Sequence, residues 1–149
     1  MSAPFNINVN AAEPGLLAPP SFAINGKQYA VALFPDGTYV LPAGAIAGVT
    51  SRPAKPGETI VLYGVGFGPV TPAIPAGQLV QQANALASSL QMSIGGLPAL
   101  ASYAGLAPSF TGLYQFNVTV PAAAPGNAPL AFTIGGVSGT QTLFIAVGN

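Results

Sequence analysis

Few residues of this chain carry side chains that can do chemistry. Its 149 residues include no histidine and no cysteine, and the carboxylates are limited to Glu13, Asp36 and Glu58. Without imidazole or thiol groups, the usual zinc, haem and iron–sulfur sites cannot form, and neither can Ser–His or Cys–His nucleophile pairs. We therefore expect no metal, no cofactor and no catalytic residue.

The three carboxylates have simpler explanations than catalysis or calcium binding. A glycosidase needs a pair of carboxyl groups at a fixed separation, and calcium takes about six to eight oxygen ligands. Asp36 lies in a Pro-Asp-Gly sequence, where its side chain can accept a hydrogen bond from the turn backbone. Glu58 follows Pro56-Gly57 and is typical of a solvated strand entrance. The sequence predicts a protein that is not an enzyme.

A glycine cluster at Gly64, Gly66 and Gly68 raises the question of phosphate binding. Its spacing is not G-x-G-x-x-G, no helical pattern follows it, and no lysine lies where a P-loop needs one. The cluster instead predicts a tight turn at the end of a strand, where only glycine is tolerated.

The aromatic side chains are five tyrosines and eight phenylalanines. Most of them fall on the apolar phase of predicted strands, which favours packing in the core. Tyr39 lies near a turn and is the candidate exposed ring for a ligand, because a tyrosine combines a flat apolar face with a polar group. A carbohydrate-binding module that presents this ring is therefore the alternative function.

Charge is scarce: only 4% of the residues are charged, with three basic and three acidic side chains and a net charge of zero, against a typical ~25%. So few cations cannot neutralise a nucleic-acid backbone, and we expect no nucleic-acid partner. Glycine, proline and polar residues interrupt every apolar run before the ~20 residues of a membrane-spanning helix, so we expect no membrane span. The opening Met1–Pro4 shows no feature of a signal peptide.

The pattern along the chain is one of strands and turns. Tyr114–Val120 alternates between apolar and polar residues throughout, and Asn25-Gly26 predicts a hairpin. With a second turn at Pro35-Asp36-Gly37, this hairpin predicts a three-stranded meander that ends at Leu41. About nine or ten short strands with regular turn signals, and no helical pattern between them, predict an all-β sandwich.

Three further segments carry expectations of their own. The continuous apolar run Thr59–Tyr63 predicts a strand buried on both faces. Residues 42–58 are small, polar and rich in proline, and predict a long connection. Gln81–Ser88 predicts one or two turns of helix.

The N-terminus offers a candidate edge-pairing strand, in which Phe5, Ile7 and Val9 alternate with asparagines. A chain with so few lysines and glutamates has little charge with which to protect exposed sheet edges. The segment could cover an edge of its own domain or pair with a neighbouring copy by strand addition.

From Gly57 onward the sequence resembles known domains in an ordered set of motifs. The segment Gly57–Val70, a strand followed by G-x-G-F-G, resembles the opening of IPT/TIG immunoglobulin-like domains. The whole series is similar to the Solibacter-type uncharacterised C-terminal domain family, with upstream matches at Pro14–Leu16 and Pro35–Thr38. The downstream motifs are Ser93–Ala99, Tyr103–Pro108, Gly112–Pro121 and Ile134–Ser138.

This resemblance covers about 130 residues and implies an immunoglobulin-like sandwich in an extracellular or cell-surface protein of a soil bacterium. The family carries no established catalytic residues to transfer. We expect a single domain over residues 1–149, with an N-terminal strand in 1–12, a meander and linker in 13–50, and the IPT/TIG-like core in 51–149. The expected function is a non-catalytic structural or assembly module, whose partners are further copies of itself or other domains of a surface protein.

Overall fold

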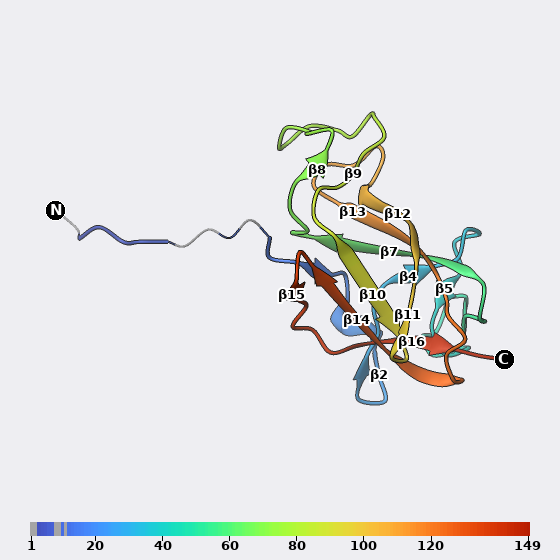
Figure 1. Ribbon diagram of the computed structural model, residues 1–149. Coiled ribbons are helices and arrows are strands. Elements are labelled where there is room, and N and C mark those ends of the chain that lie inside the picture. The colour runs from blue at the N-terminus through green and yellow to red at the C-terminus, as the bar shows by residue number, and fades with distance from the viewer. Residues whose placement is uncertain (1–2, 8–9, 11) are drawn as a thin grey trace.

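The structure is a computed structural model that describes residues 3–7, 10 and 12–149 (Figure 1). Within these residues it holds sixteen strands and one short 3-10 helix, η1 (Pro20–Phe22), so the expected all-β class is confirmed. Six strands have five or more residues: β7 (Thr59–Val65), β10 (Leu90–Ile94), β12 (Ala101–Leu106), β13 (Tyr114–Thr119), β14 (Gly126–Ile134) and β16 (Leu143–Val147). The other ten have two residues each: β1 (Gly15–Leu16), β2 (Ala23–Ile24), β3 (Lys27–Gln28), β4 (Ala32–Leu33), β5 (Tyr39–Val40), β6 (Ser51–Arg52), β8 (Val70–Thr71), β9 (Ala85–Leu86), β11 (Leu97–Pro98) and β15 (Val137–Ser138).

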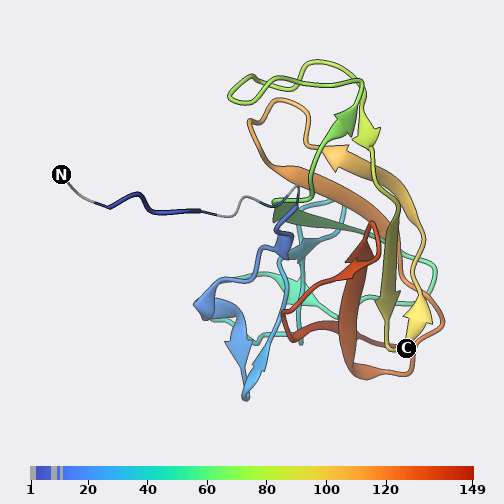
Figure 2. The same ribbon diagram turned by 60° about the vertical axis from the view of Figure 1, so that its left-hand side comes forward.

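Two sheets form the sandwich (Figures 1 and 2). The larger has the order β12-β13-β7-β4-β5-β6, with β1 also paired to β7. The smaller has the order β11-β10-β14-β15, with β16 also paired to β14. The strand count exceeds the expected nine or ten because many pairings in the described residues are only two residues long.

The core between the sheets follows the alternation of the sequence. In β13, Phe116 and Val118 are fully buried, whereas the intervening Gln115 and Asn117 are only half-buried. The ring of Phe67 packs 4.7 Å from that of Phe116 and 5.2 Å from that of Phe132, measured between centroids. The strand predicted at Tyr114–Val120 is confirmed, and it pairs with β7 and β12 on its two sides.

The expectation that Thr59–Tyr63 is buried on both faces is wrong. Ile60 and Leu62 are fully buried, but Val61 and Tyr63, on the other face of β7, are only half-buried. The strand with both faces buried is β16. Its Ile145 belongs to the main core, while Ala146 belongs to a second cluster on the other side.

This second cluster is where the N-terminal third departs from the predicted meander. The Asn25-Gly26 hairpin is confirmed, with φ values of 50° and 76°. However, β2 and β3 form a sheet of their own, while β4 and β5 join the larger sheet, so the three-stranded meander is wrong. The chain leaves the hairpin after Gln28 because Tyr29 is fully buried beside β16 and forms a parallel bridge with Phe144.

The two remaining segments contain short strands. The connection 42–58 includes β6, which pairs in parallel with β5. The helical turn predicted in Gln81–Ser88 is wrong, since β9 in this segment pairs with β8. The strand conformation lets Leu86 pack against a third cluster that contains Val80 and Leu106.

Residues from 13–50 and 51–149 share one core. Leu16, Phe34 and Val40 pack in the same cluster as Ile60, Phe116 and Ile145. The two spans are therefore not separate packing units.

Candidate assembly surface

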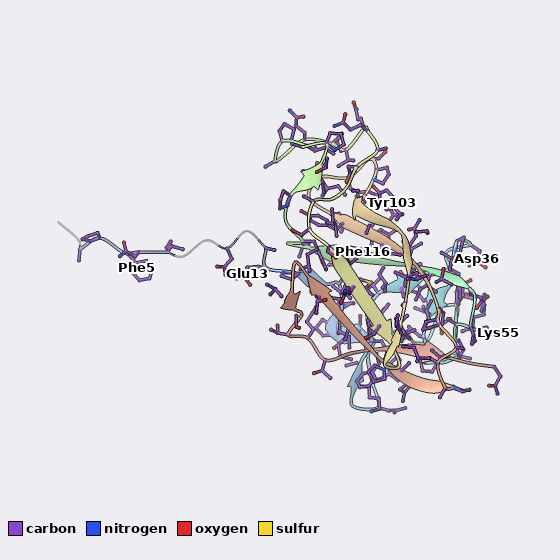
Figure 3. The ribbon with its side chains drawn as sticks, viewed as in Figure 1. Phe5, Glu13, Asp36, Lys55, Tyr103 and Phe116 are labelled. Carbon is purple, nitrogen blue, oxygen red and sulfur yellow. The ribbon has the colours of Figure 1, made fainter. Side chains whose placement is uncertain are left out.

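The N-terminal segment, defined here as residues 3–7, extends away from the sandwich (Figures 1 and 2). Phe5 is 86% exposed and Ile7 is 74% exposed, and no strand is assigned within the segment. Figure 3 shows the Phe5 side chain far from the body. The expected pairing with an edge of its own domain is therefore not observed for Phe5 or Ile7, and Val9 lies outside the described residues.

The point where this segment leaves the body is closely fixed. The Glu13 N–H donates to the Gly66 carbonyl at 2.9 Å, and Gly15 and Leu16 then pair with β7. Gly66 has a φ of 76°, and a Cβ added there would collide with the Glu13 carbonyl. Only glycine combines this conformation with such a close approach. This agrees with the glycine-dependent strand end predicted from the sequence.

One edge of the larger sheet is covered by a side-chain amide. The Leu16 N–H donates to Gln141 Oε1 at 2.8 Å, and Gln141 Nε2 donates to the Leu16 carbonyl at 2.9 Å. The side chain thus takes both main-chain hydrogen bonds that a neighbouring strand would form with Leu16. Exposed edges are templates for pairing with other chains, so this contact blocks one of them.

A second edge of the same sheet is covered in the same way. Asn84, which is 7% exposed, accepts from the Leu106 N–H at 2.7 Å and donates to the Leu106 carbonyl at 3.2 Å. Tyr103 Oη also donates to that carbonyl, at 2.6 Å. Neither Asn84 nor Gln141 was predicted from the sequence, although each binds the leucine of a Gly-Leu pair, Gly105-Leu106 and Gly15-Leu16 respectively.

The outer edge of β16 in the smaller sheet is covered by backbone. Ala30 donates to the Phe144 carbonyl, and Ala54 donates to the Ala146 carbonyl and accepts from Gly148. Tyr29 and Ala54 form parallel bridges along this strand.

The edge of β10 is open over its first residues. Ile134 pairs with Val137 across the two-residue turn Gly135-Gly136, so its N–H and C=O face β15. Leu90 lies opposite Ile134 on the other side, so its own N–H and C=O face away from β14. Among the described residues, the hydrogen bonds outside the strand ladders include none from the Leu90 backbone.

A groove of about 860 Å³ lies along this open edge, between β10 and β12. Leu90, Met92 and Phe132 contribute apolar surface from the smaller sheet, and Ala104 does so from the larger sheet. Much of the remaining lining is alanine, glycine and serine, which explains why the space is not filled. Ala99 and Leu100, where the chain passes from β11 to β12, also line the groove.

Four of the six charged side chains gather at a corner away from the groove. Arg52 forms a bidentate pair with Glu58, both N···O distances being 2.9 Å, and its guanidinium lies 3.7 Å from the centroid of the Phe34 ring. Hydrogen bonds from Arg52 and the Lys55 N–H lower the pKa of Glu58 to about 2. Asp36 accepts from the Thr38 N–H at 2.9 Å, which lowers its pKa and agrees with its expected turn role.

The prediction that the Tyr39 ring is exposed needs correction. Tyr39 is half-buried, and its ring packs edge-to-face on that of Phe22, with centroids 5.5 Å apart. The turn before it does not expose the ring, because the second cluster lies beneath it. Tyr39 is therefore half-buried and not the fully exposed ring that the sequence predicts.

The described residues also lack two further features. They contain no group of three or more histidine, cysteine, aspartate or glutamate side chains that could hold a metal ion. Across the same part of the chain, no helix has the length and apolar character needed to cross a membrane.

Comparisons with protein-family models, with curated proteins and with solved structures each found no match. In the part of the chain that the structure describes, the candidate surface combines an exposed apolar segment, covered edges at Leu16, Leu106 and β16, and an open edge at Leu90 beside a groove.

Proposed function

We propose that this chain is a non-catalytic structural module that self-associates by strand addition, in a filamentous or surface assembly. The observation that carries the proposal is the exposure of Phe5 and Ile7 on a segment that leaves the body. Burying such a side chain is worth about 1.5–3 kcal/mol, so association that covers both is favoured. As the family resemblance implies, we place the assembly outside the cell.

The charge distribution supports the same proposal. The net charge is zero, so copies do not repel one another at long range. Four of the six charged residues, Asp36, Arg52, Lys55 and Glu58, lie together at one corner. The segment and the groove therefore carry few charges that would have to be desolvated on association.

The test is the mass of the protein in solution. We expect the full chain to form assemblies in sedimentation velocity, and we expect the double variant Phe5→Asn with Ile7→Asn to remain a monomer. The matched control is Asn6→Ser with Asn8→Ser, which changes the polar phase of the same segment and should assemble normally. A full chain that stays monomeric up to millimolar concentration would overturn the proposal.

The carbohydrate-binding alternative has less support, because Tyr39 is half-buried and packs on Phe22. A polysaccharide pull-down that is lost in Tyr39→Ala, together with a monomeric full chain, would favour it over assembly.

A further inference from the structure

The open edge of β10 has unused main-chain hydrogen-bonding groups. The N–H and C=O of Leu90 face outward, whereas the Met92 carbonyl two residues on is already taken by the Ala99 N–H. At Leu90 the next position across the sheet is vacant, because β11 pairs only with Ser93 and Ile94. An added strand could bond there as in β-augmentation.

The groove beside this edge suits an apolar strand. Leu90, Leu86 and Ala104 are only half-buried although they pack against the main core. A strand that lies along β10 would place every second side chain over them. Small side chains such as Ala99, Ala101 and Ala104 leave room for large ones.

The N-terminal segment has the matching pattern, which continues in the sequence to Val9. Phe5, Ile7 and Val9 are two residues apart, so in a strand they share one face, and the asparagines between them share the other. Phe5 and Ile7 do not contact the groove of their own chain, since both are largely exposed and the segment leaves the body (Figure 3). The occupant that fits these observations is the segment of a second copy.

Covered edges elsewhere in the sandwich leave an incoming strand fewer alternatives to this groove. Leu16 and Leu106 have their edge hydrogen bonds taken by Gln141 and Asn84, and β16 is covered by backbone. An incoming strand would have to displace these contacts, whereas no hydrogen bond outside the strand ladders of the described residues involves the Leu90 backbone.

We propose that the groove along β10 is the acceptor site for the N-terminal segment of a second copy, with Phe5 and Ile7 inserted between β10 and β12. This inference rests on the proposed self-association and adds the site at which it occurs. Each copy would have one donor segment and one acceptor groove, so the contact is head-to-tail and can propagate.

The first test changes the groove at an exposed position. Leu100 lines the groove and is 76% exposed, so Leu100→Glu should leave the fold intact. We expect it to weaken assembly in sedimentation by at least about tenfold, since a carboxylate would have to be buried against the apolar segment. The matched control is Leu79→Glu, because Leu79 is 58% exposed and lies outside the groove.

The second test uses the absence of cysteine in the chain. The variant Ile7→Cys with Ala101→Cys, oxidised while assembled, should give a ladder of covalent oligomers on a denaturing gel. The control Ile7→Cys with Leu79→Cys should give far less. A purely intramolecular disulfide would overturn the proposal, because the segment would then fill the groove of its own chain.

The outcomes separate the two proposals. If the full chain assembles and Phe5→Asn with Ile7→Asn does not, but Leu100→Glu assembles normally and the cysteine pair gives no ladder, the groove is not the acceptor although self-association stands. If the full chain is monomeric at every concentration, self-association itself is wrong.

Discussion

Two strand edges of this sandwich differ in whether their outward main-chain groups have hydrogen-bond partners. At Leu106 in β12, the buried side chain of Asn84 takes both main-chain hydrogen bonds. At Leu90 in β10, across the groove, the outward backbone groups have no such cover. A protein with six charged residues cannot protect its edges by charge, and this one uses neutral amides. The difference shows that an edge can be blocked without charge, which makes the edge left open informative.

The largest effect should come from removing the cover of β12. Asn84→Leu leaves the Leu106 N–H without its partner in a buried setting, and the Leu106 carbonyl keeps only Tyr103. We expect the free energy of unfolding, measured by urea denaturation, to fall by about 3 kcal/mol. A loss below about 0.5 kcal/mol would show that Asn84 does not hold this edge.

A smaller effect should follow from crowding the same amide. A Cβ at Gly105 would lie 2.6 Å from Asn84 Oδ1 and 2.9 Å from the Asn84 carbonyl. We expect Gly105→Ala to lower the free energy of unfolding by about 2 kcal/mol in the same assay.

The other Gly-Leu pair supplies the control for Gly105→Ala. At Gly15 the nearest atom to an added Cβ is Gln141 Oε1, at 3.7 Å, which is ordinary contact. Gly15→Ala should therefore change the stability far less, and equal losses in the two variants would contradict the geometric argument.

The exposed amide should matter less than the buried one. Gln141→Ala removes both side-chain bonds to Leu16, but Gln141 is exposed, so water can replace them. We expect a loss of about 1 kcal/mol in chemical denaturation. Sedimentation of this variant should also show whether the β1 edge, once it has lost the Gln141 amide, forms new contacts between copies. A loss as large as that of Asn84→Leu would mean that burial does not set the difference.

The smallest effect should be a dependence on acid at the charged corner. The pKa of Glu58 is about 2 in the folded protein against an ordinary 4.5, so the unfolded chain binds its proton first as the pH falls. The contribution of this carboxylate is therefore complete above about pH 4.5 and is lost between about 4.5 and 2. As the pH falls through this window, the melting temperature of Glu58→Gln should fall less than that of the parent. From about pH 5 to 8 the melting temperature of both should vary little.

Local patterns predicted those elements whose structure is decided locally. Asn25-Gly26 specifies its hairpin through two positive φ angles, and Tyr114–Val120 specifies its buried face by alternation. The meander failed at Tyr29, where burial against Phe144 outweighs continuation of the hairpin. Gln81–Ser88 failed because Leu86 gains more from the third cluster than from a helical turn.

The candidate surface, too, was only partly predictable from the sequence. The apolar alternation of Phe5, Ile7 and Val9 is visible in the sequence, and it identified the candidate donor segment. The acceptor groove could not be predicted from the sequence. It exists because Leu90 pairs with β14 on one side and, among the described residues, has no strand on its other side, which only the fold determines. Asn84 and Gln141 were missed for a similar reason: an amide covers an edge only when the fold brings it to a particular leucine.

The contact between Glu13 and Gly66 has a mechanical consequence. Because the chain is held to the rigid sheet from Glu13 onward, any linkage through residues before it hinges at one fixed point on each copy. A force applied to the N-terminal segment would therefore reach β7 through this one attachment, and a bulkier side chain at Gly66 would weaken it.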